Sequence, residues 1–157
     1  MKISLIVIGK TADTRIAELI EDYARRISHY LTFSIEVIPE LKNMRSLTVD
    51  QQKEKEGEML LKSLQPADFL ALLDERGKEM RSVDFARWLE KMAQASTKRL
   101  VFAIGGPYGF SPAVYAKARA KVSLSAMTFP HEMARLIFAE QLYRAMTIIK
   151  GEPYHHE

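Results

Sequence analysis

The sequence predicts an α/β fold, with a mostly parallel β-sheet that carries helices on both faces. Short runs of apolar residues are typical of strands, and the segments between them place apolar residues three and four positions apart, as amphipathic helices do. Strands that alternate with helices in this way form parallel sheets. The 157 residues, 47% of them hydrophobic, suit a single domain over residues 1–157, and no linker or repeat divides them.

The first strand is expected at Ile3–Ile8, a continuous apolar run rich in β-branched residues that is typical of a strand covered on both faces. A helix follows over residues 16–27, where the apolar residues fall on one stripe. The run Phe33–Ile38 alternates and is predicted to be the second strand. Residues 41–50 show little periodicity and are expected to form a loop.

The middle of the chain begins with a helix start signal. Thr48 and Gln51 have the spacing of a capping box, which predicts a helix through about Leu64. The third strand is expected at Asp68–Leu73, and the sequence "DERGKEM" is expected to form a charged turn after it.

The remaining elements follow the same alternation. Ser82 is expected to cap a helix whose apolar residues share one face, and "RLVFAI", residues 99–104, predicts the fourth strand. Pro112 suits the first position of a short helix. Residues 121–127 are the candidate fifth strand, and a long helix is predicted over residues 132–148.

Composition excludes several classes of protein. The chain has no cysteine, which excludes disulfides, thiolate zinc sites and a cysteine nucleophile, and which suits a cytoplasmic location. No apolar run approaches the roughly 20 residues that span a bilayer, and the N-terminus lacks the cleavage site of a signal peptide, so we expect no membrane association. The net charge of +3 permits an anionic partner without requiring one.

The most informative stretch is "IGGPYG", in which the fourth strand runs into Gly105, Gly106 and Gly109. It has neither the dinucleotide-binding spacing nor a P-loop, and Pro107 removes a backbone N–H that a phosphate would need. The turn therefore favours a largely uncharged ligand surface, such as adenine or a sugar edge, lying against bare backbone. The alternative is a strand-to-helix turn that needs glycine only for a positive φ.

Two further loops are expected beside this turn, because ligands of parallel α/β sheets bind beyond the carboxyl ends of the strands. One loop follows the third strand, at "LLDERG". The other, "SAMTFPH", follows the fifth strand and is small and apolar, with few hydroxyl groups. Apolar walls with backbone polar groups suit the adenine and methionine parts of S-adenosylmethionine.

Several stretches together resemble a known family: "IGGPYGFS", "SLSAMTFPHEMARLIFAEQLYRA" and the terminal "GEPYHHE", with "VIGK" near the start and "KEGEMLL" in the middle. In this order, and over essentially the whole chain, they resemble the bacterial large-subunit ribosomal RNA methyltransferases of the SPOUT class. The resemblance implies an α/β domain with a C-terminal trefoil knot that works as a homodimer. It also implies methyl transfer from S-adenosylmethionine to N3 of a pseudouridine in 23S rRNA of the assembled ribosome.

The resemblance further assigns the site residues. Arg144, Tyr154 and His155 are expected on the substrate side. The cofactor is expected to contact the ends of the third and fourth strands and the loop after the fifth, at Leu73, Gly105, Leu124, Ser125, Ala126, Met127, Thr128 and Phe129.

Methyl transfer to an imide nitrogen requires an in-line approach and loss of the N–H proton. His155 is the candidate proton acceptor, Arg144 is expected to hold a phosphate or the developing negative charge, and Tyr154 is expected to stack on the base or donate a hydrogen bond. The alternative is a frayed tail without a role. His131 is expected to cap or orient the cofactor loop rather than to catalyse.

No metal is expected. His155 and His156 are adjacent and cannot share a helix face, so they do not form a ligand set with His131 and Glu157.

The predicted last helix is apolar nearly all round, which requires cover on two sides. A symmetry mate is expected to supply the second cover, and it would bring Arg144 and the tail of one subunit to the cofactor of its partner. The alternative is a central helix buried within one subunit.

Basic residues spread along the chain are candidates for contacts with rRNA phosphates, and such contacts would weaken with salt. Three other functions stay open: a SPOUT enzyme that acts on tRNA, a non-enzymatic nucleotide-binding module, and a structural ribosome-associated factor. The tRNA enzymes commonly add RNA-binding domains, for which 157 residues leave no room. The candidate phosphate contacts are Arg25, Arg26, Lys42, Arg45, Lys53, Lys55, Arg76 and Lys78.

Overall fold

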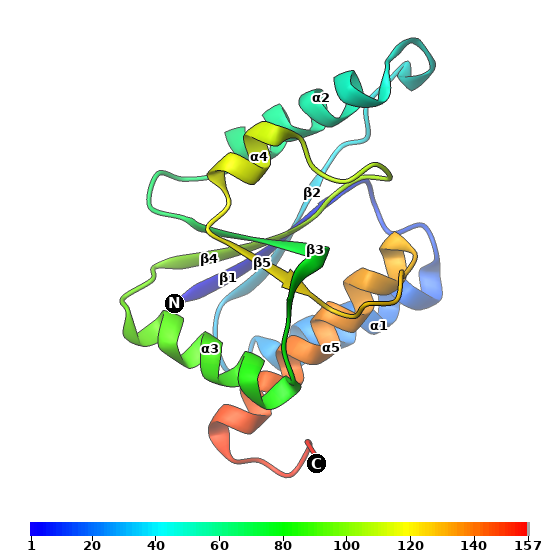
Figure 1. The fold of residues 1–157 in the computed structure, drawn as a ribbon. Coiled ribbons are helices and arrows are strands. Elements are labelled where there is room, and N and C mark those ends of the chain that lie inside the picture. Colours follow the sequence, from blue (N-terminus) through cyan, green and yellow to red (C-terminus); the bar gives the residue numbers. More distant parts are fainter. Residues whose placement is uncertain (157) are drawn as a thin grey trace.

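The computed structural model describes residues 1–156, and Glu157 lies outside the described residues. Five strands form one sheet in the order β2-β1-β4-β3-β5, and every neighbouring pair is parallel (Figure 1). The α/β fold class is therefore confirmed. The strands are β1 (Lys2–Ile8), β2 (Phe33–Ile38), β3 (Phe69–Glu79), β4 (Arg99–Ile104) and β5 (Ala120–Ser123).

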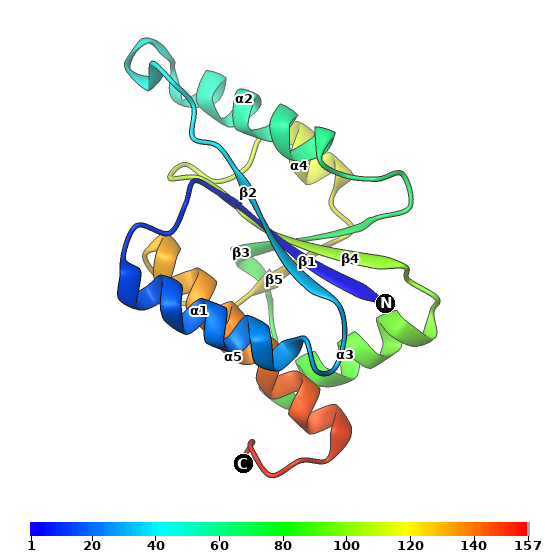
Figure 2. The same ribbon diagram turned by 180° about the vertical axis from the view of Figure 1, so that it is seen from behind.

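Helices cover both faces of the sheet. Figures 1 and 2 show α1, α3 and α5 on one face and α2 and α4 on the other. A short 3-10 turn, η1 (Met44–Ser46), precedes α2. The helices are α1 (Thr14–Ile27), α2 (Val49–Lys62), α3 (Ser82–Gln94), α4 (Pro112–Lys117) and α5 (His131–Lys150).

The alternation of side chains along β4 builds two hydrophobic cores. Phe102 packs with Phe138 and Leu142 of α5 on one face of the sheet. Val101 points the other way and packs with Leu60 of α2. Since successive strand residues face opposite sides, one buried strand serves both layers.

The predicted helix starts are confirmed at two helices and wrong at a third. At α2, Gln51 N–H donates to Thr48 Oγ1 (3.1 Å) and Thr48 N–H donates to Gln51 Oε1 (3.0 Å), which is the expected capping box. Pro112 begins α4. Ser82, however, does not cap α3: it lies inside the helix, and its hydroxyl donates to Gln141 Oε1 of α5 (2.7 Å).

The predicted charged turn after Leu73 is also wrong, because β3 continues to Glu79. Leu73 and Lys78 both pair with Val122, so the residues between them bulge out of the ladder with β5. Gly77 permits this arrangement. A Cβ atom there would lie 2.6 Å from the carbonyl carbon of Lys121 and 2.7 Å from Val122 N.

Helix α5 is packed within one chain more fully than its sequence suggested. It contacts α1, α3 and β4, and Phe138, Ala139 and Leu142 are completely buried. The alternative of a central helix therefore accounts for much of its apolar surface. Met133 nevertheless remains 37% exposed. The knot and the homodimer stay predictions.

Replacing Gly77 with alanine is expected to destabilise the fold by about 1–3 kcal/mol, because the new methyl group overlaps backbone atoms of β5 that cannot move aside as a side chain would. Chemical denaturation measures this loss. The matched control is Glu79→Ala, at an exposed position of the same strand, which should change the free energy of unfolding far less. Equal stability of the two variants would contradict the proposed close approach.

Candidate functional site

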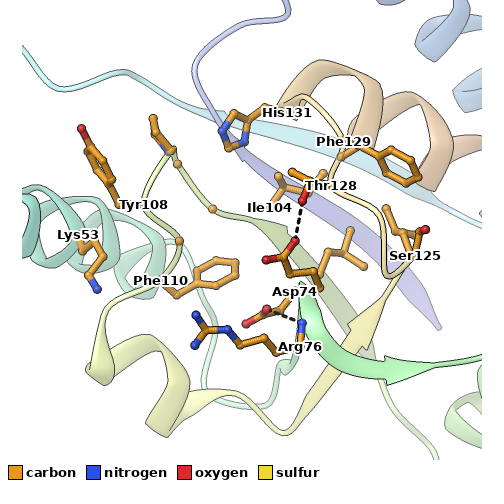
Figure 3. A pocket seen from close by; sticks show the side chains of 18 of the residues that line it. Lys53, Asp74, Arg76, Ile104, Tyr108, Phe110, Ser125, Thr128, Phe129 and His131 are labelled. Atoms are coloured by element: carbon orange, nitrogen blue, oxygen red, sulfur yellow. Dashed lines mark hydrogen bonds between the residues drawn. The ribbon is translucent and has the colours of Figure 1, made fainter.

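A cavity of about 470 Å³ lies beside the bulged middle of β3 and at the carboxyl ends of β4 and β5. Figure 3 shows side chains around it from the middle of β3 and from the loops after β4 and β5, with Lys53 of α2 beside them. On β3 the lining residues are 73–76, the other two segments follow Ile104 and Ser123, and the first turn of α5 closes one side. The loops after β4 and β5 meet as the sequence predicted, because parallel strands end at the same edge, whereas the third segment, predicted as a loop, is part of β3.

Nearly all the predicted cofactor residues line this cavity. Ala126 is the exception: it is exposed and lies outside the lining. The residues that do line it are Leu73, Gly105, Leu124, Ser125, Met127, Thr128 and Phe129.

The glycine turn combines both explanations that the sequence allowed. Gly109 has a φ of +82° and its N–H donates to Gly106 O (3.1 Å), so it serves the turn itself. Gly106 serves close approach instead, since a Cβ there would lie 2.6 and 2.7 Å from the carboxylate oxygens of Glu56. Gly109 is required for its positive φ, whereas a larger residue at Gly106 would need the Glu56 side chain to shift.

Hydroxyl groups hold the loop after β5 in shape. Ser123 Oγ donates to Ser125 O (2.9 Å), and Ser125 Oγ accepts from Met127 N–H (3.0 Å). Thr128 Oγ1 donates across the cavity mouth to Glu75 Oε2 (3.1 Å; Figure 3). The Met127 side chain is left 76% exposed, which places a large apolar group at the surface beside the cavity.

The rim of the cavity carries charges of both signs. Asp74 accepts hydrogen bonds from Arg76 N–H (2.9 Å) and from the Tyr115 hydroxyl. Burial, followed by this bond to Asp74, raises the pKa of Tyr115 to about 12. The sequence indicated this strand edge, but the resemblance assigned only Leu73 there. The signal was present in the charged "DERG" that follows a buried apolar run.

His131 is the first residue of α5 and lines the cavity. Among residues 1–156, no hydrogen bond joins its side chain to the helix start or to the loop, and the N-cap residue is Pro130. The predicted capping role is therefore wrong, although its position beside the cofactor loop is as expected.

The predicted substrate-side residues form a second cluster around Glu140 of α5. Glu140 Oε1 accepts from Arg144 Nε (3.0 Å), Arg144 Nη2 (2.7 Å) and the Tyr154 hydroxyl (3.1 Å). Arg144 Nη1 lies 3.1 Å from His155 Nδ1, and its guanidinium lies over the Tyr154 ring. Glu140 was missed by sequence reasoning, although it lies one helical turn before Arg144, a spacing typical of ion pairs.

This cluster is supported by Tyr23 of α1, Tyr143 of α5 and Tyr30 of the turn after α1. The Tyr143 ring packs edge-on against Tyr154 at 4.7 Å between centroids, and Tyr23 and Tyr30 flank Tyr143. Burial is the main cause that raises the pKa of Tyr154, followed by its bond to Tyr23 and the charge of Glu140. The Tyr30 hydroxyl donates to Glu152 (2.6 Å), which raises the pKa of Tyr30 to about 12. The tail is therefore held against α1 and α5.

The two clusters lie at opposite ends of α5. Ala134 lines the cavity, and Arg144 follows ten residues later on the same helix. At 1.5 Å per residue this separates them by about 15 Å along the axis. Figure 1 likewise shows the tail at the far end of α5 from the loop that precedes the helix.

The candidate phosphate contacts are spread over several elements. Lys53 and Arg76 line the cavity, whereas Arg25 and Arg26 pair with Asp22 on α1. The others are exposed in the loop before α2, on α2 and on β3, at Lys42, Arg45, Lys55 and Lys78.

No group of three or more His, Asp or Glu side chains within residues 1–156 is arranged to hold a metal ion. In the same part of the chain, no helix has both the length and the apolar composition needed to cross a bilayer.

Comparison with known proteins gives a consistent result. A family model described as "Predicted SPOUT methyltransferase" matches residues 1–155. The chain is 61% identical to Ribosomal RNA large subunit methyltransferase H of Bacteroides fragilis and 57% identical to that of Phocaeicola vulgatus, over 100% of both chains in each case. A solved structure, a probable methylase family protein from Haemophilus influenzae, shares the fold with a TM-score of 0.52 at 14% identity, over 95% of this chain and 66% of that one.

Glu56 should make stability fall as pH rises. Burial, with a smaller effect from the charge of Glu40, raises the pKa of Glu56 above its ordinary value of 4.5. The folded protein therefore keeps this proton to a higher pH than the unfolded chain does, and stability is lost as pH rises through the folded-state value.

We expect Glu56→Gln to remove that loss. The free energy of unfolding of the variant, relative to that of the wild type, should therefore increase as pH rises from below 4.5 and then become constant. Denaturation at a series of pH values measures the difference. The control is Glu58→Gln, at an exposed position on the same helix. Parallel curves for Glu56→Gln and the wild type would contradict the prediction.

Proposed function

This chain belongs to the SPOUT methyltransferase family, and we propose that it transfers the methyl group of S-adenosylmethionine to N3 of a pseudouridine in 23S rRNA of the assembled ribosome. The observation that carries the proposal is the cavity formed by the bulged part of β3 and the loops after β4 and β5. The names and full-length identity of the relatives favour rRNA over tRNA as the substrate. We expect the protein to act in the cytoplasm, where bacterial ribosomes are.

The residues around the cavity fit this cofactor. Its volume of about 470 Å³ falls within the range of small-molecule sites. Leu73, Ile104 and Leu124 offer apolar walls for adenine, and the backbone of the glycine turn offers polar groups for its edge. The rim carries both carboxylates and cations, which suits a ligand that has a carboxylate, an ammonium group and a sulfonium. When bound, S-adenosylmethionine supplies a methyl group that is already activated.

Arg144, Tyr154 and His155 bind the target base in this proposal. The base carries a negative charge once its imide N–H is lost, and the Arg144 guanidinium stabilises that charge. The Tyr154 ring offers a face on which a base can stack. Lys53 and Arg76, at the cavity mouth, are placed to contact the rRNA backbone.

A second copy of the chain completes the site in this proposal. Reacting atoms must approach to about 3–3.5 Å, yet Arg144 lies about 15 Å along α5 from the cavity of its own chain. The exposed side chains of Met127 and Met133 offer apolar surface for a partner beside the cavity. A homodimer in which the tail of one subunit reaches the cavity of the other satisfies both observations.

Labelled S-adenosylmethionine and ribosomes that lack the modification test the function. We expect one labelled methyl group per ribosome, mapped to a pseudouridine of 23S rRNA, and calorimetric binding of S-adenosylmethionine but not of ATP or NAD. Binding without transfer to ribosomes, with transfer to tRNA instead, would support the tRNA alternative. Binding of ATP in place of S-adenosylmethionine would indicate a nucleotide-binding module.

Mixing two inactive variants tests the shared site. Gly105→Val fills the glycine turn, where even a Cβ would lie only 3.2 Å from the Gly109 backbone, and Arg144→Ala removes the substrate-side cation. In an equal mixture of the two, about a quarter of the wild-type rate should return, because half the dimers are mixed and each keeps one intact site. No recovery, or sedimentation as a monomer at micromolar concentration, would contradict the dimer.

A further inference from the structure

The contact between Arg144 and His155 fixes the state of the histidine ring. Arg144 Nη1 lies 3.1 Å from His155 Nδ1. A guanidinium in a protein has five N–H donors and no acceptor. The nitrogen that meets it must therefore be the acceptor, and Nδ1 carries no proton in this arrangement.

The other ring nitrogen then has a defined role. A neutral imidazole carries one proton, and since Nδ1 accepts, that proton lies on Nε2. Nδ1 uses its lone pair on Arg144, and Nε2 has an N–H in place of a lone pair. His155 is thus prepared to donate a hydrogen bond and has no free site at which to accept a proton. This disagrees with its expected role as the proton acceptor.

Glu140 is the group that holds this arrangement. Its Oε1 engages Nε and Nη2 of Arg144, which leaves Nη1 facing His155. Its Oε2 accepts from Gln141 Nε2 (2.9 Å), so the carboxylate is itself held. Side chains from each packed element face the cluster: Glu140 and Arg144 of α5, Tyr154 of the tail, and Tyr23 and Arg26 of α1.

We propose that Glu140 and Arg144 hold His155 as a hydrogen-bond donor, and that its Nε2–H and Arg144 together stabilise the deprotonated target base. This inference rests on the proposed function. The imide proton leaves to water before transfer. The nitrogen lone pair then forms the new N–C bond while the S–C bond breaks and leaves its electron pair on sulfur, so the anionic base and the sulfonium both become neutral. Glu140 and Arg144 are positioning residues for His155, and Arg144 also contacts the base.

The ring state can be measured without any turnover. In the protein labelled with ¹⁵N-histidine, the His155 signals, identified by their loss in His155→Gln, should show a protonated Nε2 and an unprotonated Nδ1 at pH 8. A ring protonated on Nδ1 would overturn the proposal. This result is independent of whether ribosomes are methylated, so it distinguishes failure of the inference from failure of the proposed function.

Substitutions of His155 distinguish a hydrogen-bond donor from a proton acceptor at this position. Glutamine can donate a hydrogen bond but cannot take the proton, whereas glutamate can take the proton but cannot donate when ionised. We expect His155→Gln to keep kcat within about tenfold of the wild type, and His155→Glu and His155→Ala to lose about a hundredfold or more, as when one donor to an oxyanion is removed. The control is His156→Gln, at the exposed neighbour, which should keep wild-type activity. Greater activity for His155→Glu than for His155→Gln would overturn the proposal.

The dependence of the methylation rate on pH gives a further test. With water as the proton acceptor, the rate should keep rising above the range in which histidines titrate, in both the wild type and His155→Gln. A plateau in that range that is lost in His155→Gln would overturn the proposal.

Glu140→Gln should lower kcat about tenfold or more with unchanged affinity for S-adenosylmethionine. Its control, Glu90→Gln, alters an exposed carboxylate on α3 and should leave kcat unchanged.

Discussion

One buried cation ties helix α5 to the end of strand β1. Arg135 is 5% exposed, and its guanidinium donates to Ile8 O (2.8 Å), Gly9 O (2.9 Å) and Thr11 Oγ1 (3.0 Å) at the carboxyl end of β1. Burial lowers its pKa, and its Nε has no partner, so burying this cation costs free energy. It fixes the first turn of α5 to the sheet. The cavity at one end of the helix and the Glu140 cluster toward the other both depend on that placement.

Local patterns predicted the elements well, since strand runs, helical stripes and the Thr48 capping box are encoded by neighbouring residues. They failed where a distant contact decides the outcome. Beyond Leu73, β3 continues because Gly77 lies against the backbone of Lys121 and Val122, more than forty residues later. Serine is a common N-cap residue, but the Ser82 hydroxyl donates to Gln141 of α5 instead. Neither partner is visible in a window of the sequence.

The residues of the candidate site were likewise predictable only in part. The loops after β4 and β5 were predictable because parallel strands end at one edge, and of the predicted cofactor residues only Ala126 lies outside the cavity lining. Glu56 was missed, although Gln52, Glu56 and Leu60 recur every four residues and share a buried helix face, so polar residues in an apolar stripe were the available signal. Glu140 was missed because its role depends on the folding back of the tail, which places Tyr154 and His155 beside Arg144.

The length of α5 also bears on how a dimer would form. If the site joins the Arg144 end of one subunit to the Ala134 end of another, a twofold axis must cross the helix near its middle, around Ala139, because residue 144 then meets 134 and the reverse holds at the same time. Met133, Leu136, Ile137, Glu140 and Arg144 recur at three- and four-residue spacing, and none of them is completely buried within one chain. That stripe is the face of α5 available to a partner. A rigid helix anchored by Arg135 would then set the distance between the two ends, and one symmetric contact would complete both sites.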